Sequence, residues 1–340
     1  MIEITPKQRL LDALNKKRVD RPPVICMGGM MNASIVEVMN SSGYLLPAAH
    51  DSPEMMASLA GAIHEQTGFE NLGVPFCMTV EAELLGSTID KGTLACEPKI
   101  TREAFPSVEK VVFREIDEMI EAGRIRTVTS ATGSLAARHG HLPVIVSMTG
   151  PVSTAASIVD PMMFYKQLRK NPAAAHRLLE YVTTLLIRFA EESVKAGAAV
   201  IAIGDPSATG EILGPAMFRE FAVRYLNVLT EAVHRLGTPV ILHICGDIER
   251  VRFLVPDLKA DALSTDAMVN LAKLKEEYPQ VTTMGNLSTY ALEWSTPGKI
   301  ALQTRKLVED GIDIISPACG LSTSTTLANI RAMTGTVRGA

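Results

Sequence analysis

The chain repeats one short unit in which an amphipathic helix ends at a glycine and an apolar strand follows. Three copies, VKAGAAVIAIGDP, HRLGTPVILHICG and VEDGIDIISPACG, occupy residues 194–206, 234–246 and 308–320. Several such strands are apolar on both faces, as is typical of parallel strands that helices cover on both sides. The unit therefore predicts an α/β fold made of successive strand–helix pairs.

Eight expected strands follow one another, which favours a (β/α)8 TIM barrel over an open doubly wound sheet. No low-complexity stretch or Ser/Gly linker interrupts the 340 residues, so we expect a single barrel domain over residues 1–340. Residues 1–23 are charged and amphipathic and predict an N-terminal helical extension across the bottom or side of the barrel. Residues 75–142 predict an insertion over the barrel mouth. The expected strands are 22–27, 69–74, 143–150, 199–206, 239–246, 261–267, 281–286 and 313–320.

Charge is interspersed along the chain, where 33 Lys+Arg and 37 Asp+Glu give a net charge of −4. The absence of a basic run and an aromatic content of 5% argue against a nucleic-acid partner. No run of about 18 uncharged apolar residues predicts a membrane span. The five cysteines are odd in number and widely spaced, unlike a secreted disulfide framework. We therefore expect a cytoplasmic protein whose thiols are buried or bound to metal.

The carboxyl ends of the expected strands carry many potential metal ligands. In a (β/α)8 barrel these ends face the active site. The polar and thiol side chains found there are Cys26, Asp205, His243, Cys245, Asp266, Asn286 and Cys319.

His243 and Cys245 lie two residues apart on one expected strand, so their side chains point to the same face. Cys319 ends the last strand and is followed by a glycine, as Cys245 is. One imidazole and two thiolates suit Zn²⁺, and three ligands with one open position are typical of a catalytic zinc. A buried histidine with two unrelated core cysteines is the simpler alternative.

Over nearly its full length the chain also resembles the zinc-dependent corrinoid methyltransferases of the uroporphyrinogen decarboxylase-like superfamily. The resemblance rests on RLLDALNKKRVDRPPV, VPFCMTVEAELLGSTIDKG, MTGPVSTAASIV, AGAAVIAIGDPSA, VILHICGD, MGNLST and GIDIISPACGLSTSTTLANIRAM. It implies that His243, Cys245 and Cys319 bind a catalytic zinc ion. It also implies that a thiol, coenzyme M, is activated there as a thiolate and takes a methyl group from methylcobalamin on a separate corrinoid protein.

Four further residues are expected at the site. Asp266 stands where the relatives carry a glutamate, and we expect it as a fourth zinc ligand or beside the zinc, among the catalytic residues. Asp205, Glu83 and Asn286 are expected to line the substrate pocket, although turn capping also explains Asp205 and solvent exposure also explains Glu83. The Ser/Thr run at 322–326 is expected to cap the final helix.

Three other functions remain open. Uroporphyrinogen decarboxylation uses no metal and needs an arginine-rich cleft, whereas VICMGGMMNAS at 24–34 contains no arginine. A corrinoid-linked methyltransferase with a different donor or acceptor, such as a methylated thiol or tetrahydrofolate, fits the same ligands. A non-catalytic zinc-binding partner fits less well, because structural zinc sites fill all four positions with protein ligands.

Overall fold

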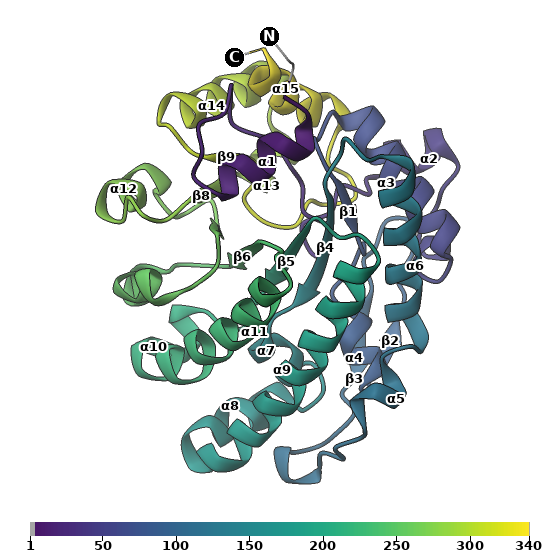
Figure 1. Cartoon of the computed structure of the whole chain (residues 1–340), viewed down its shortest axis with the longest axis vertical. Helices are drawn as coiled ribbons and strands as arrows, with labels where there is room; N and C mark the ends of the chain where they lie inside the picture. The colour runs from purple at the N-terminus through teal and green to yellow at the C-terminus, as the bar shows by residue number, and fades with distance from the viewer. Residues whose placement is uncertain (1–3, 340) are drawn as a thin grey trace.

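A computed structural model describes residues 4–339, and its main feature is a curled parallel sheet surrounded by helices (Figure 1). Seven strands pair in the order β1-β4-β5-β6-β7-β8-β9, and every pair is parallel. The predicted α/β barrel is confirmed. The strands are β1 Leu72–Val74, β4 Val144–Thr149, β5 Val200–Gly204, β6 Val240–Ile244, β7 Ala262–Thr265, β8 Thr283–Leu287 and β9 Ile314–Pro317.

The first expected strand, 22–27, is irregular and makes a single bridge, between Val24 and Ile315 of β9. On its other side, the carbonyl of Val24 accepts a hydrogen bond of 2.8 Å from the N–H of Glu70, just before β1. The side chains of Glu70 and Asn71 bond the other backbone groups of the segment and so replace the ladder of a regular strand. The prediction of a full strand here is wrong, but the segment closes the (β/α)8 barrel between β9 and β1.

Helices cover the outside of the sheet, and the colour in Figure 1 changes progressively round this ring, so segments adjacent in sequence are adjacent in space. Several begin at a polar side chain that accepts a hydrogen bond from the first turn, such as Ser52, Asp160 and Asn171. The longer helices are α3 Pro53–Thr67, α6 Gly123–Arg138, α8 Pro161–Lys170, α9 Pro172–Lys195, α11 Arg224–Arg235, α14 Pro297–Glu309 and α15 Leu327–Arg338. The shorter ones include α2 Val36–Ser42, α4 Val80–Leu84, α5 Ile116–Met119, α7 Pro151–Ala156, α10 Gly210–Met217, η4 Glu249–Asp257, α12 Leu271–Glu277 and α13 Thr289–Trp294.

The amino end of the barrel is filled with apolar side chains and closed by α1 (Pro6–Leu14). Strand residues alternate between the inside and the outside of the barrel. Inward-facing Ile145 and Ile241 belong to one buried cluster with Leu10 and Leu14 of α1. The predicted N-terminal extension therefore closes the bottom of the barrel, although residues 1–3 of the predicted segment lie outside the described part.

The connection between β1 and β4 carries the additional structure that was predicted at the mouth. Its hairpin, β2 (Thr88–Asp90) with β3 (Lys99–Arg102), is antiparallel. In the hairpin turn, the carbonyl of Ala95 accepts a hydrogen bond of 3.1 Å from Thr323, which lies in the loop after β9. Helix α6 contacts α3 and α9 and so belongs to the outer ring. The insertion is therefore shorter than the predicted 75–142 and ends before α6.

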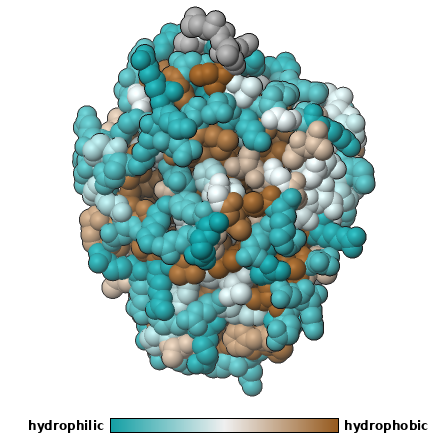
Figure 2. All heavy atoms as spheres, in the orientation of Figure 1, coloured by the Kyte–Doolittle hydropathy of each residue, from teal (hydrophilic) through white to brown (hydrophobic). Residues whose placement is uncertain are grey.

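Figure 2 shows one face of the molecule, on which hydrophilic residues predominate and apolar residues form separate groups. Some exposed apolar area is usual for a folded protein. Within residues 4–339, no helix combines the length and the apolar character needed to cross a membrane.

Candidate metal centre

Three potential metal ligands meet at the carboxyl end of the barrel. His243 is in β6, Cys245 follows β6 directly, and Cys319 lies shortly after β9. His243 Nε2 is 3.1 Å from Cys245 Sγ, and the two sulfurs are 3.6 Å apart. The ligand atoms all lie within 4.8 Å of one another. Gly246, with φ of +72°, lets the chain turn sharply after Cys245.

The donor set suits a tetrahedral zinc ion. Two thiolates at about 2.3 Å from zinc would be about 3.8 Å apart in tetrahedral geometry, close to the 3.6 Å found between the sulfurs. The second ring nitrogen of His243, Nδ1, lies 3.0 Å from Ser264 Oγ, a contact of the kind that orients zinc-bound histidines. His243 is fully buried and both cysteines are half-buried, so the cluster is accessible from the side of its sulfurs.

The two thiols control each other's protonation. A hydrogen bond from Cys245 lowers the pKa of Cys319, and His243 lowers it further, although burial opposes both. The hydrogen bond with Cys319 and burial raise the pKa of Cys245. One proton is therefore held between the two sulfurs, and a metal ion that bound both would displace it.

Asp205 lies directly after β5, but its side chain serves a neighbouring loop. The buried carboxylate accepts hydrogen bonds from the N–H groups of Val152 and Ser153, at 3.1 and 2.8 Å, and from the Ser153 hydroxyl at 2.6 Å. Burial raises the pKa of Asp205 to about 6, although these hydrogen bonds act in the opposite direction. Its hydrogen bonds are those of a residue that caps α7.

Asp266 follows β7 and lies near the cluster. After the hydrogen bond with Cys319 and burial, the charge of Asp266 is a further cause of the raised pKa of Cys245. Among the described residues, the ligand atoms within 4.8 Å of one another come from the histidine and the two cysteines alone. Asn286 donates hydrogen bonds of 2.8 Å to the carbonyls of Asp266 and Val269. Asn286 thus holds the loop that carries Asp266.

The two glutamates of α4 differ sharply in their surroundings. The side chain of Glu83 is 33% exposed and pairs with Arg124 and Lys91, which matches the solvent-exposure alternative. Glu81 is 2% exposed and accepts a hydrogen bond of 2.8 Å from the N–H of Thr149, at the end of β4. Burial raises the pKa of Glu81. The buried carboxylate of this helix is therefore Glu81, whereas the sequence favoured Glu83.

The Ser/Thr run at 322–326 does not cap α15 in the predicted way. The side chain of Thr326, at the start of this helix, makes no capping hydrogen bond, and the N–H of Leu327 donates to the carboxylate of Glu37. The hydroxyls of Ser322 and Ser324 instead donate to Glu293. The cap prediction is wrong because carboxylates from other segments bind both the helix end and the hydroxyls.

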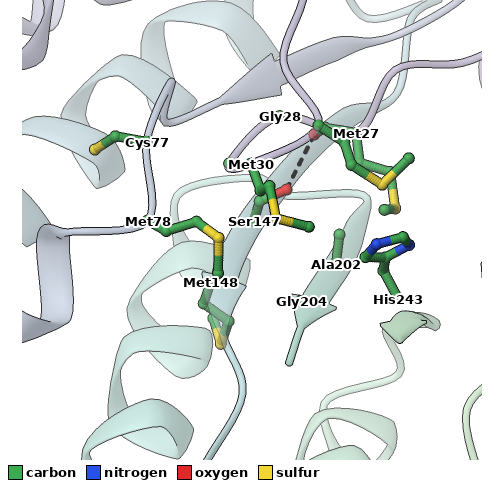
Figure 3. Close-up of a pocket in the computed structure, with 12 residues that line it drawn as sticks. Met27, Gly28, Met30, Cys77, Met78, Ser147, Met148, Ala202, Gly204 and His243 are labelled. Carbon is green, nitrogen blue, oxygen red and sulfur yellow. Dashed lines mark hydrogen bonds between the residues drawn. The ribbon is translucent and has the colours of Figure 1, made fainter. Parts of the chain in front are cut away.

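A pocket opens beside His243 inside the barrel mouth (Figure 3). Gly204 of β5 widens it, because a Cβ atom on this glycine would meet nothing within 4 Å. Cys77 lies at the far side, with its sulfur directed away from His243. Neither this pocket nor Ser264 is predicted from the sequence, although the pocket's richness in methionine is visible in CMGGMMN at 26–32. The methionines that line it are Met27, Met30, Met31, Met78 and Met148.

Fold and site together define a class of protein, a (β/α)8 barrel that gathers one imidazole and two thiols at the carboxyl ends of its strands. The family model described as uroporphyrinogen decarboxylase (URO-D) matches residues 5–340. The chain therefore belongs to the uroporphyrinogen decarboxylase family.

Within this family, the chain is similar over its full length to corrinoid methyltransferases. Methylcobamide:CoM methyltransferase MtbA of Methanosarcina mazei is 33% identical over 339 residues, which cover 98% of this chain and 97% of the relative. Methylcobamide:CoM methyltransferase MtaA of Methanosarcina barkeri is 32% identical over 337 residues, with the same coverage of 98% and 97%. A uroporphyrinogen decarboxylase of Anaeromyxobacter sp. is 27% identical over 301 residues, 84% of each chain. The predicted kinship with the corrinoid methyltransferases is confirmed.

The solved structures agree with this placement. A methyltransferase from Methanosarcina mazei superposes with a TM-score of 0.92 at 32% identity and covers 99% of both chains. A B12-independent methionine synthase from Shewanella sp. W3-18-1 has a TM-score of 0.55 at 14% identity, with coverage of 94% of this chain and 98% of its own. The second likeness shows the barrel fold alone.

Proposed function

We propose that this protein is a methyltransferase that moves a methyl group from methylcobalamin, carried by a separate corrinoid protein, to a small thiol at the cluster of His243, Cys245 and Cys319. The observation that carries the proposal is the convergence of their three ligand atoms within 4.8 Å. The names of MtbA and MtaA support it, since they describe a methylcobamide and coenzyme M as reactants. Coenzyme M is therefore the thiol with which other methyl acceptors are to be compared.

Zinc fits the donor set, and when bound it would supply the Lewis acidity that keeps a thiol deprotonated and nucleophilic at neutral pH. Ser264 would hold the imidazole of His243 in place through Nδ1. The exposed side of Cys245 and Cys319 gives the substrate sulfur its approach. In the transfer, that sulfur forms a bond to the methyl carbon while the carbon–cobalt bond breaks, and the electron pair of that bond stays on cobalt.

We propose that Asp205, Glu83 and Asn286 shape the substrate pocket indirectly, through the residues that they contact. Asp205 and Asn286 hold the loops after β4 and β7, and Glu83 pairs with Arg124 behind Cys77. Asp266 is proposed as a resting fourth ligand, or as a carboxylate beside the metal. Asp266→Ala should then keep its zinc but change the affinity for the thiol, as titration of the variant with thiol would show. Loss of zinc from this variant would make Asp266 an obligatory ligand.

The reverse direction, from a methylated thiol to the corrinoid, is the second candidate. A methylated-thiol–coenzyme M methyltransferase of Methanosarcina mazei is 29% identical over 332 residues, 97% of this chain. Because the free cysteines of the site call for a reducing compartment, we place either reaction in the cytoplasm.

The decisive experiment combines two measurements on the purified protein. Metal analysis should find one zinc per chain, and free methylcobalamin should lose its methyl group to a member of a panel of small thiols that includes coenzyme M. The methylated thiol, identified by mass spectrometry, must appear in step with the loss of methylcobalamin. The proposal is contradicted if the zinc-loaded protein transfers the methyl group of methylcobalamin to none of the thiols in the panel.

A further inference from the structure

Among residues 4–339, those that line the pocket beside His243 include no charged side chain (Figure 3). Thioethers, glycines, one alanine, Ser147, Cys77 and the imidazole of His243 form its walls. The hydroxyl of Ser147 already donates a hydrogen bond of 3.1 Å to the carbonyl of Met27. An anionic group placed in this pocket would lose its water without gaining a cation, which is strongly unfavourable.

Carboxylates lie at the turn that follows Cys245. The carboxylate of Glu211 reaches over the residue that follows Cys245, since a Cβ on Gly246 would lie 2.9 Å from Glu211 Oε2. Asp247 is the next residue along the chain. Two carboxylates therefore flank the turn after Cys245.

Two more carboxylates approach from other loops. The turn of the insertion hairpin carries Glu97 and contacts the loop that follows Cys319, because the hydroxyl of Thr323 donates a hydrogen bond of 3.1 Å to the carbonyl of Ala95. Thr265 of β7 pairs with Ile244 of β6, so the residues that follow them, Asp266 and Cys245, lie beside each other. Among the ion pairs within residues 4–339, none involves these four groups, which we call the mouth carboxylates: Glu97, Glu211, Asp247 and Asp266.

Two groups of donors that could receive an anion are already engaged. Arg124 stands behind Cys77, where its Nη1 donates to Cys77 Sγ at 3.0 Å, its Nη2 donates to Thr79 Oγ1 at 2.8 Å, and its Nε pairs with Glu83. The serine hydroxyls of the loop after β9 are bound to the carboxylate of Glu293. Neither group is free for the anionic end of a substrate.

We infer that the thiol taken by this enzyme is small and carries no negative charge at its far end, in contrast to coenzyme M, whose far end is a sulfonate. This inference rests on the proposed function, because it concerns a thiol held by its sulfur at the three-ligand cluster. From that sulfur, a two-carbon chain runs either into the pocket beside His243 or out between the mouth carboxylates. The first path offers an anion no cation, and the second brings like charges together. Glu97 and Glu211, which approach from outside the ligand-bearing strands, then act as specificity-determining residues.

A matched series of two-carbon thiols tests this inference with the zinc-loaded protein and free methylcobalamin. The series is 2-mercaptoethanesulfonate, 2-mercaptoethanol and 2-aminoethanethiol, which differ only in an anionic, neutral or cationic end. The kcat/KM for the sulfonate should be at least about tenfold below that for the neutral thiol. The cationic thiol should be used at least as well as the neutral one, and added salt should reduce the differences.

The double variant Glu97→Gln/Glu211→Gln should raise the sulfonate-to-neutral ratio of kcat/KM several-fold, by about three- to tenfold. Glu309→Gln is the matched control, since this exposed glutamate ends α14 just before β9, at the amino end of the strands, and should leave the ratio as it is. A sulfonate thiol used as well as or better than the neutral one overturns the inference while the proposed function stands. Failure of all three thiols to accept the methyl group refutes the proposed function itself, and the inference with it.

Discussion

The amino end of the barrel interior is apolar and closed, whereas the carboxyl end is polar, half-open and rich in sulfur. Along β6 the same inward face carries Ile241 in the lower apolar cluster, then His243, and then Cys245 just beyond the strand. Along β7, Ala262 lies in the lower cluster and Ser264 contacts His243. The inward-facing positions of the same strands thus contribute to both ends of the barrel, and the two ends differ in the residue types at these positions.

This difference separates stability from chemistry. The lower cluster contains side chains of α1 and of six strands, all buried, so its contacts contribute to folding. The ligand cluster lies above this layer, with two cysteines that are half-buried and can be removed without opening the lower core. Substitutions at one end should therefore leave the other end largely unaffected.

The largest effect is expected from the ligands themselves. Cys245→Ala and Cys319→Ala should each lose zinc and at least about a thousandfold of the methyl-transfer rate, because the metal would activate the substrate sulfur. Metal analysis and methylcobalamin demethylation measure both losses, and thermal unfolding by circular dichroism should show an intact barrel. Cys96→Ala is the matched control, since this thiol is exposed. Full zinc and full turnover in either ligand variant would show that the ligand assignment is wrong.

At the closed end, Leu10→Ala should lower the free energy of unfolding by about 2–5 kcal/mol, as is typical of a leucine truncated in a packed core. Leu10 is 0% exposed, whereas Leu302 on α14 is 65% exposed and serves as the control. Leu302→Ala should change the free energy by less than about 0.5 kcal/mol. Urea unfolding measures both, and the zinc content of folded Leu10→Ala should stay at one per chain. Loss of zinc from the folded variant would mean that the two ends are coupled.

At the carboxyl end, Asp205 makes the stability depend on pH. Its folded-state pKa is raised to about 6 from 3.8, so the folded protein holds the proton more tightly than the unfolded chain. The stability of the protein relative to Asp205→Asn should therefore be greatest below about pH 4 and fall by about 3 kcal/mol as the pH rises through 6. Urea unfolding of both proteins from pH 4 to 7 gives this difference. A difference that is constant over this range would show that the pKa of Asp205 is not raised.

The smallest effect is expected one hydrogen bond away from the metal. Ser264→Ala removes the partner of His243 Nδ1 and should weaken zinc binding by about 10- to 100-fold. Competition with a chromophoric chelator measures the affinity. Ser316→Ala is the control, because this buried serine of β9 donates to the carbonyl of Pro317 instead. Equal zinc affinity in the two variants would remove Ser264 from the site.

Much of the architecture can be predicted because the sequence repeats it. The units that end in Asp205, Cys245 and Cys319 give β5, β6 and β9, and the two-residue spacing of His243 and Cys245 brings their side chains together. Ser264 could have been predicted in the same way, because it lies two residues before Asp266 in the sequence. That residues 1–340 form one domain stays a prediction.

The remainder depends on contacts between distant segments. The strand expected at 22–27 is irregular because the side chains of Glu70 and Asn71 accept hydrogen bonds from its backbone N–H groups in place of a neighbouring strand. No local sequence pattern predicts these contacts. The choice between Glu81 and Glu83 turns on which carboxylate meets the end of β4. The sequence of one helix with glutamates two residues apart does not show which of the two carboxylates is buried.

X-ray absorption at the zinc edge tests the central claim most directly, that the site activates a thiol by direct coordination. The zinc-loaded protein should show two sulfur neighbours at about 2.3 Å, with a histidine nitrogen. Saturation with 2-mercaptoethanol should add a third sulfur at the same distance, and about one proton per site should be released. A sulfur count that stays at two under saturating thiol would contradict direct coordination, and with it the choice of a thiol as the methyl acceptor.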